Sequence, residues 1–157
     1  MIELAIPGVG SLGLTHLLSD LNGTLAVDGV LQPGVAARLE ALTKQLEVSL
    51  LTADTHGSAS YIESQFPSLH VTRLEPGHEA EAKRDEVLRL GAEGVVFLGN
   101  GANDVLALEA AALGIAVIGG EGAYPPVLPA ADLVVQSPAD ALDLLLYPKR
   151  IIAGLRR

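Results

Sequence analysis

The sequence contains no cysteine and no tryptophan, and aromatic residues make up only 3% of it. Without cysteine the chain can form neither a disulfide nor a thiolate metal site. This composition fits a reducing compartment, and we expect a cytoplasmic protein. Because aromatic residues are so few, the core must be formed by leucine, valine, isoleucine and alanine, which is typical of helices laid on a buried parallel sheet.

Positive charge and long apolar runs are also scarce. The chain has 10 lysines and arginines against 19 aspartates and glutamates, which gives a net charge of −9. This excess of negative charge argues against binding to nucleic acid or to an anionic membrane surface. No run of 18 apolar residues occurs, and no basic segment followed by an apolar one opens the chain, so we expect no membrane span and no signal peptide.

What the sequence does contain is a regular alternation of apolar strands and helices. Its 157 residues predict a single domain, with a core over 14–146 and a basic C-terminal tail over 148–157. The alternation predicts an α/β fold with a doubly wound, mostly parallel sheet. We expect its strands at 14–20, 46–52, 69–74, 94–98, 115–118 and 133–135, and helices at 33–46, 56–66, 79–90, 103–113 and 138–146. The sequence predicts a short edge strand at residues 2–6 and a small hairpin at residues 24–31, which we call the flap.

The stretch from Leu17 to Leu25, Leu-Leu-Ser-Asp-Leu-Asn-Gly-Thr-Leu, is the centre of this pattern. A buried strand here delivers the carboxylate of Asp20 to its C-terminal end, and open α/β sheets place ligands at that edge. Asp20 could serve there as an aspartyl nucleophile or as a metal ligand. The alternative is that Asp20 only caps the following turn.

Other polar residues follow neighbouring strands and should reach the same edge. Thr52 ends one strand, and Gly99-Asn100-Gly101-Ala102-Asn103-Asp104 follows another. Simpler interpretations exist: Thr52 could merely end its strand, Asn103 could be a helix N-cap, and Lys83 could lie on a solvated helix face paired with Glu79. No glycine-rich turn follows a first strand, so a dinucleotide-binding domain is not indicated.

The motifs Asp20-Leu21-Asn22-Gly23-Thr24 and 99–104 together resemble those of the haloacid dehalogenase superfamily. The resemblance is greatest to the phosphorylation domain of P-type ATPases, whose motifs read DKTGT and GDGxND. Thr52 and Lys83 stand where the second and third motifs of that superfamily would be, and the four motifs span about residues 14–136. The resemblance implies a Mg²⁺-dependent phosphohydrolase, acting through an aspartyl phosphate on a small phosphorylated substrate.

The resemblance also implies a role for each motif residue. Asp20 would be the nucleophile, and Thr52 and Lys83 would hold phosphate oxygens beside it. Gly23 would let the chain turn close to the phosphate, and Asn103 would assist binding there. The implied Mg²⁺ ligands are Asp20, the main-chain carbonyl of Asn22, Asn100 and Asp104, the last through water or else acting to orient Lys83.

Two departures from the superfamily pattern bear on activity. Asn22 stands where its phosphatases have the aspartic acid that protonates the leaving group and activates water, and an amide can do neither. Asn100 replaces the usual metal-binding aspartate and brings no charge. We therefore expect slow turnover, and the alternative is a weakened binding or regulatory module that binds phosphate or a partner protein.

The spacing of the motifs leaves no room for a cap domain. Only 27 residues lie between Thr24 and Thr52, and 30 between Thr52 and Lys83. The expected flap, helices and strands use nearly all of them. An open site excludes water poorly, so we expect that a neighbouring subunit of a homo-oligomer covers it, or that the substrate is large, or that turnover is slow.

Overall fold

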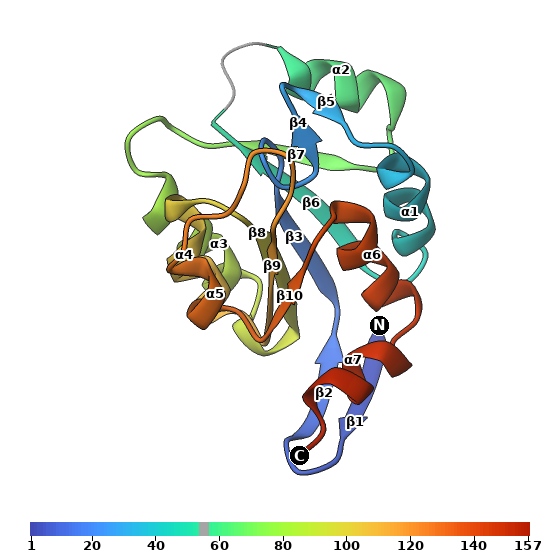
Figure 1. Cartoon of the computed structure of the whole chain (residues 1–157). Helices are drawn as coiled ribbons and strands as arrows, with labels where there is room; N and C mark the ends of the chain where they lie inside the picture. Colours follow the sequence, from blue (N-terminus) through green and yellow to red (C-terminus); the bar gives the residue numbers. More distant parts are fainter. Residues whose placement is uncertain (54–56) are drawn as a thin grey trace.

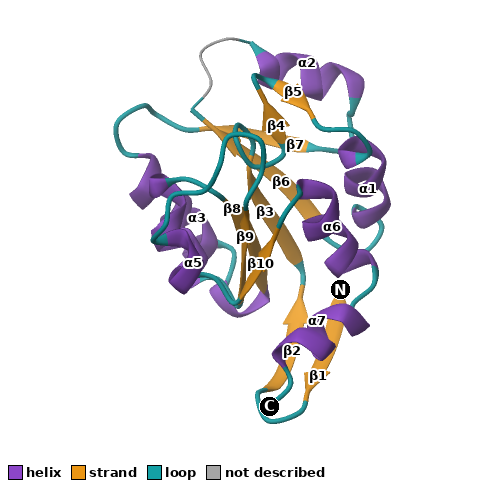
Figure 2. Cartoon of the chain, in the orientation of Figure 1, coloured by secondary structure: helices purple, strands orange, loops and turns teal. Residues whose placement is uncertain are grey.

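The computed structural model describes residues 1–53 and 57–157 and is built around a six-stranded parallel sheet (Figures 1 and 2). The strand order is β10-β9-β8-β3-β6-β7, and each neighbouring pair is parallel. The strands are β3 (His16–Asp20), β6 (Glu47–Thr52), β7 (His70–Arg73), β8 (Val95–Gly99), β9 (Leu113–Val117) and β10 (Leu133–Val135). This confirms the predicted doubly wound α/β fold.

Helices cover both faces of the sheet. On one side lie α1 (Val35–Leu42) and α6 (Pro138–Leu146), and on the other α3 (Glu79–Arg89), α4 (Val105–Ala110) and α5 (Val127–Ala130) (Figure 1). Within β3, Leu17 belongs to the first of the two resulting cores and Leu18 to the second. Because both faces are buried, two successive positions of β3 are apolar, instead of apolar and polar residues alternating there.

A small hairpin and a short helix stand beyond the C-terminal ends of the central strands. The hairpin pairs β4 (Ala26–Val27) with β5 (Val30–Leu31) in antiparallel fashion, which confirms the predicted flap. Its turn residues Asp28 and Gly29 have φ of 51° and 77°, the left-handed backbone that Asp-Gly hairpin turns favour. Helix α2 (Ser58–Gln65) lies beside it in Figure 1, and its predicted start at His56 falls outside the described residues.

The two chain ends differ from their predictions. β1 (Ile2–Ile6) is not an edge strand of the large sheet but pairs with an unpredicted strand, β2 (Gly10–Leu14). The residues expected as a basic tail include a helix, α7 (Lys149–Leu155), which packs against β1 (Figure 1). Ile151 is buried there, so the apolar side chains between the basic pairs decide the conformation.

The helix predicted at 103–113 is also shorter than expected. It consists of a 3-10 turn (Ala102–Asp104) followed by α4, and β9 already begins at Leu113. Leu113 is fully buried in the sheet, and the ladder with β8 extends back to it. Across the described ranges, no helix is both long and apolar enough to cross a membrane.

A bidentate ion pair between Arg38 and Asp143 joins α1 to α6 and makes a pH-dependent contribution to stability. Arg38 donates from Nε to Asp143 Oδ1 at 2.8 Å and from Nη2 to Oδ2 at 3.2 Å. These hydrogen bonds hold the pKa of Asp143 below its usual 3.8. A carboxyl with a lowered folded pKa stabilises the fold above its unfolded pKa, and the contribution is lost as pH falls through the folded value.

We therefore expect Asp143→Asn to lower Tm at pH 7 by roughly 1–3 °C. The difference from the unmodified chain should shrink below pH 3.8. Calorimetry at pH 7 and pH 3 measures both, with exposed Asp85→Asn as the control. An equal difference at both pH values would contradict the assignment.

Candidate functional site

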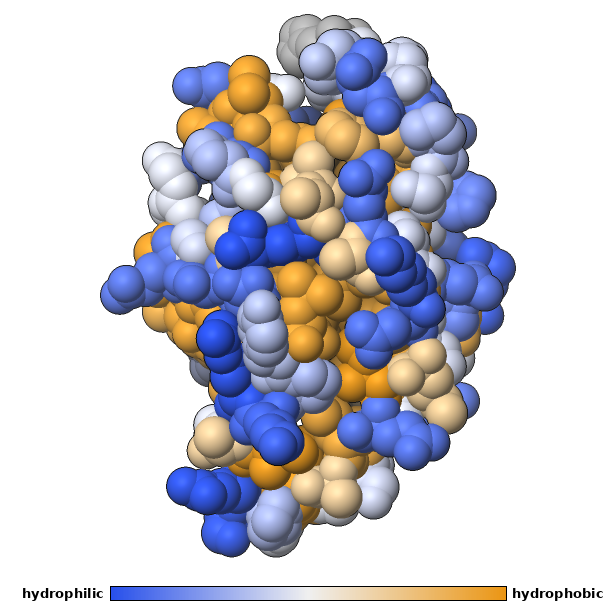
Figure 3. All heavy atoms as spheres, turned by 90° about the vertical axis from the view of Figure 1, so that its right-hand side faces the viewer, coloured by the Kyte–Doolittle hydropathy of each residue, from blue (hydrophilic) through white to orange (hydrophobic). Residues whose placement is uncertain are grey.

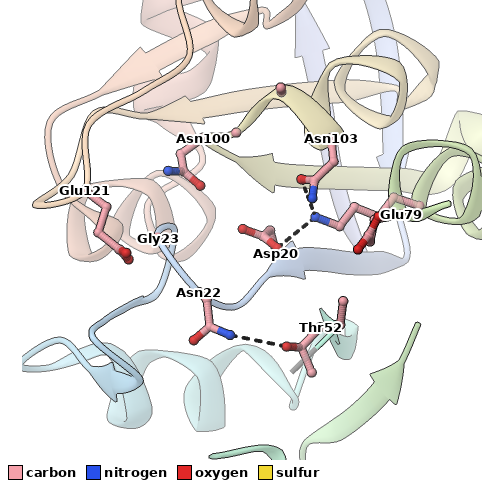
Figure 4. A pocket seen from close by; sticks show the side chains of 12 residues that line it. Asp20, Asn22, Gly23, Thr52, Glu79, Asn100, Asn103 and Glu121 are labelled. Atoms are coloured by element: carbon pink, nitrogen blue, oxygen red, sulfur yellow. Dashed lines mark hydrogen bonds and ion pairs between the residues drawn. The ribbon is translucent and has the colours of Figure 1, made fainter. Parts of the chain in front are cut away.

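Lys83 is the centre of the polar cluster at the C-terminal edge of the sheet. Its Nζ donates to Asp20 Oδ1 at 2.8 Å, to Asn103 Oδ1 at 2.9 Å and to Asp104 Oδ1 at 2.7 Å. The side chain is only 2% exposed, so the alternative of a solvated helix face is wrong. Asp20, Asn103 and Asp104, which come from two distant segments of the chain, thus meet at the ammonium group of Lys83. Figure 4 shows Asp20 and Asn103 directed toward the same nitrogen.

The protonation of this cluster follows from burial and charge. Burial by itself lowers the pKa of Lys83, but Asp20 and Asp104 outweigh it and hold the pKa above its ordinary value. Burial, reinforced by the like charge of Asp104, raises the pKa of Asp20 to about 7 despite its bonds with Lys83 and Thr24. With all three groups ionised the cluster carries one excess negative charge, which a bound cation would balance.

Asp104 is held rigidly by the loop after β8. Its Oδ2 accepts hydrogen bonds from the backbone N–H groups of Asn100 and Gly101, both at 2.9 Å. The side chain is fully buried, and a Cβ at residue 99 would lie 2.5 Å from Asp104 Cβ. Only glycine therefore fits at 99. Since both Asp104 oxygens are engaged, the contacts suit orienting Lys83 better than direct metal binding.

Thr24 and Asn100 connect the first and fourth motifs. The Thr24 hydroxyl lies 3.1 Å from Asp20 Oδ2 and 3.0 Å from Asn100 Oδ1, and it can donate its single proton to either. Asn100 Nδ2 donates to the carbonyl of Gly122 at 3.1 Å, which orients the amide with its oxygen toward Thr24. Gly23 has φ +84°, and a Cβ there would lie 2.8 Å from Asn100 Nδ2, so this position requires glycine twice over.

On the other side of Asp20, Asn22 faces Thr52. Asn22 Nδ2 donates to Thr52 Oγ1 at 3.3 Å, and both residues line a pocket of about 640 Å³ (Figure 4). The structure thus brings together all eight residues named from the sequence. Asp20, Asn22, Gly23, Thr52, Lys83, Asn100 and Asn103 line the pocket, and Asp104 lies directly behind it.

Two acidic residues that line the pocket were not predicted as site residues from the sequence. Glu121 enters from the turn after β9, where Gly122 N–H donates to the Gly119 carbonyl, and its carboxylate points toward Gly23 and Asn22 (Figure 4). Glu79 enters from the start of α3, and its Oε2 accepts from the Gly77 N–H at 3.0 Å. The only signal for Glu121 was its place in a Gly-Gly-Glu-Gly turn following a strand.

The donor set of the pocket suits a hard cation. Asp20, Asn100 and the Asn22 carbonyl offer oxygen, and Glu121 could add a second carboxylate. Across 1–53 and 57–157, no three acidic or histidine side chains gather into a metal-binding group. A cation here would depend on few carboxylates and several waters, which is how Mg²⁺ is usually held and not how zinc is.

Removing the lysine should destabilise the fold strongly. We expect Lys83→Met to lower the free energy of unfolding by about 3–5 kcal/mol, because it leaves two carboxylates facing each other in a buried site. Urea unfolding followed by circular dichroism measures the loss. Exposed Lys44→Met is the matched control and should change little. The double variant Lys83→Met/Asp104→Asn should recover part of the loss, and a Lys83→Met effect below about 1 kcal/mol would contradict the buried ion pair.

The sequence has relatives among known proteins, although no family model matches it. It is 41% identical over 92 residues to an uncharacterized protein of Methanocaldococcus jannaschii, covering 56% of this chain and 99% of the relative. It is 33% identical over 137 residues to a copper-exporting P-type ATPase of Staphylococcus epidermidis. That match covers 87% of this chain but only 16% of the ATPase.

Solved structures show the same architecture. A magnesium and phosphate complex of 3-deoxy-D-manno-octulosonate 8-phosphate phosphatase from Moraxella catarrhalis superposes with a TM-score of 0.69 at 15% identity, covering 91% of this chain and 94% of that one. A Legionella pneumophila protein assigned to subfamily III A of the haloacid dehalogenase hydrolases gives 0.71 at 17% identity, covering 90% and 87%.

These likenesses define the fold. The chain has the fold of the haloacid dehalogenase hydrolases, and its described residues form no cap domain. This confirms the resemblance stated from the sequence. The chain and the Methanocaldococcus jannaschii protein belong to one family. Because that relative is uncharacterized, the match assigns no activity.

Proposed function

We propose that the chain is a Mg²⁺-dependent phosphohydrolase whose nucleophile is Asp20. The observation that carries this proposal is the bonding of Asp20 to Lys83 at the floor of a polar pocket. A carboxylate, a fixed ammonium group and hydroxyl and amide donors around one cavity suit a transferring phosphoryl group, whose charge spreads over its oxygens.

The reaction would proceed in two displacements. A carboxylate oxygen of Asp20 would form a bond to phosphorus while the ester oxygen leaves as an alcohol, taking its proton from water and leaving hydroxide. A second water would then attack the phosphorus of the aspartyl phosphate, and the proton it releases would neutralise that hydroxide. Inorganic phosphate would leave, with the Asp20 carboxylate restored. Lys83 and Thr52 would hold phosphate oxygens in both steps, and Asp104 would keep Lys83 in place.

Mg²⁺ bound beside Asp20 would neutralise charge on the phosphoryl oxygens. Asp20, Asn100 and the carbonyl of Asn22 would hold it, as the donor set permits. Because Asn22 and Asn100 bring no charge, we propose weak metal binding. Asn22 also supplies neither acid nor base, so the chain lacks an effect that typically contributes about 10²–10⁴ in rate.

The same two amides favour a second candidate function. A site that keeps Asp20, Lys83 and Asp104 but lacks two carboxylates could bind phosphate, or a partner protein, without turnover. Beryllofluoride distinguishes the two, because it forms an adduct only with an aspartate that can accept a phosphoryl group. A stoichiometric adduct requiring Mg²⁺, detected by ¹⁹F NMR, would count against the binding module.

The direct test is a screen of small phosphorylated metabolites, acetyl phosphate and an aryl phosphate. We expect slow release of inorganic phosphate that requires Mg²⁺ and stops with EDTA. The same screen with Asp20→Asn separates activity of this site from contamination. Release that continues in EDTA, or no release from any compound, would overturn the proposed function.

A further inference from the structure

A second, larger pocket opens directly beside the site. It has a volume of about 1220 Å³ and lies between the flap hairpin, α1 and α2. We call it the flap pocket, and the large apolar side chains that line it are Val30, Leu31, Tyr61, Ile62 and Phe66. Asn22 and Glu121 line both cavities, so the flap pocket is continuous with the place where phosphate would bind.

The flap pocket differs chemically from the site beside it. Its wall is formed mainly by aliphatic and aromatic side chains, whereas the site is lined by charged and amide groups. Val30 and Tyr61 are 66% and 65% exposed, although both are large apolar side chains. Exposed apolar groups gathered around a cavity indicate ligand binding more than folding.

The charged residues that line the flap pocket narrow the class of ligand that it can bind. Asp28 and Glu121 are the charged residues of the flap pocket, and both are acidic. Among its described lining residues there is no lysine, arginine or histidine. A second phosphate or a carboxylate on the ligand would therefore enter without a cationic partner, against the field of a chain with net charge −9.

We propose that the flap pocket binds the alcohol part of the substrate, and that the substrate is a phosphate monoester of an apolar or aromatic alcohol without a second anionic group. The identity of the phosphate end rests on the function proposed above. The phosphate lies against Lys83, and the ester oxygen lies near Asn22 and Glu121 at the junction of the two cavities. The organic part then extends between the flap and α2.

This placement also answers the problem of an open site. With no cap domain, water reaches the phosphoryl group from the side of the flap unless something covers it. An apolar group seated against Val30 and Tyr61 would close that side and remove their exposed surface from water. The bound substrate would thus provide part of the enclosure that a cap provides elsewhere.

The test is equilibrium binding, which does not depend on turnover. Calorimetry with the non-hydrolysing Asp20→Asn chain, checked for folding by circular dichroism, compares methyl, phenyl and 1-naphthyl phosphate in Mg²⁺. A further pair, 4-methylphenyl and 4-carboxyphenyl phosphate, tests charge. We expect 1-naphthyl phosphate to bind at least about tenfold more tightly than methyl phosphate, and the carboxylate to weaken binding.

Substitutions of two exposed residues of the flap pocket test whether the preference for 1-naphthyl phosphate arises there. Tyr61→Ser and Val30→Ser should each reduce the preference for 1-naphthyl phosphate several-fold and leave methyl phosphate unchanged. Tyr147→Ser is the matched control, because Tyr147 is 55% exposed and lines neither cavity. Equal binding of the three esters, or equal effects of the two tyrosine variants, would overturn the inference, as would failure of every ester to bind.

The experiments distinguish failure of the flap-pocket proposal from failure of the phosphohydrolase proposal. A naphthyl preference that depends on Tyr61, in a chain that hydrolyses none of these esters, supports the flap pocket and overturns the phosphohydrolase. Hydrolysis of acetyl phosphate by the unmodified chain, with no preference for apolar esters, overturns the flap pocket and leaves the phosphohydrolase standing.

Discussion

Asp20→Asn is expected to abolish Mg²⁺-dependent hydrolysis of aryl phosphates, to the limit of detection. An amide is a poor nucleophile toward phosphorus, and it would remove the negative charge beside the proposed Mg²⁺ site. The replacement is nearly isosteric, so its oxygen can still accept the hydrogen bond that Lys83 now donates to Asp20 Oδ1. The loss should therefore come from chemistry rather than from unfolding.

The stability of the same variant provides the necessary control. Burial raises the pKa of Asp20 to about 7. In the unfolded chain the pKa of this carboxyl is 3.8. The free energy of unfolding therefore falls as pH rises from 3.8 to about 7, because the folded state binds its proton more tightly than the unfolded state. Asn carries no charge, so at pH 7 the variant should be at least as stable as the unmodified chain.

Activity is measured as phosphate release with Mg²⁺, in parallel with thermal unfolding and with exposed Asp85→Asn. Hydrolysis that persists in pure, folded Asp20→Asn would show that another group carries the reaction. Glu121 would then be the first candidate, since it lines the same pocket.

Asn22→Asp is expected to raise the turnover number by about 10²–10⁴. Asn22 lines the pocket and lies 3.3 Å from Thr52 Oγ1, so a carboxyl there reaches the space where the leaving oxygen would sit. An aspartic acid could protonate that oxygen and then accept a proton from the attacking water. The Thr52 hydroxyl could donate to the new carboxylate in place of the present hydrogen bond.

The pH profile separates this explanation from a general effect on folding or metal binding. Acid–base catalysis by the new carboxyl should add a titration to the pH dependence of the turnover number that the unmodified chain lacks. The double variant Asp20→Asn/Asn22→Asp should be inactive. An unchanged turnover number in a folded Asn22→Asp chain would mean that proton transfer is not what limits the rate.

The sheet, Asp20, Thr52 and the loop at 99–104 could be predicted from the sequence because each leaves a local pattern. Leu17 and Leu18 are buried on opposite faces, so β3 has adjacent apolar residues where a half-exposed strand would alternate. Asp20 and Thr52 stand at the C-terminal ends of their strands, and parallel strands bring such ends to one edge. Gly23 and Gly99 are required because the side chains of Asn100 and Asp104 lie where a Cβ would be, and such glycines mark the loops in the sequence.

Features built from distant segments were not readable. The acidic residues around Lys83 suggested a solvated helix face, and only the packing of α3 against the loop after β8 shows that its ammonium group is buried. Glu121 carries no motif, and its place in the pocket depends on the turn after β9. The helix at the C-terminus forms because Ile151 finds an apolar surface there, near the other end of the chain.

The sequence by itself thus indicated the strand–helix alternation, the absence of a cap, and the convergence of Asp20, Thr52 and the loop at 99–104 on one edge of the sheet, because strand ends and glycine turns leave local patterns. Lys83, which lies within a helix, was assigned only through the resemblance to the superfamily. The tertiary structure alone decided that Lys83 is buried between two carboxylates, that Glu121 joins the site and that an apolar pocket adjoins it. Each of these depends on contacts between segments far apart in the chain, where burial and charge are set by neighbours that no local pattern names.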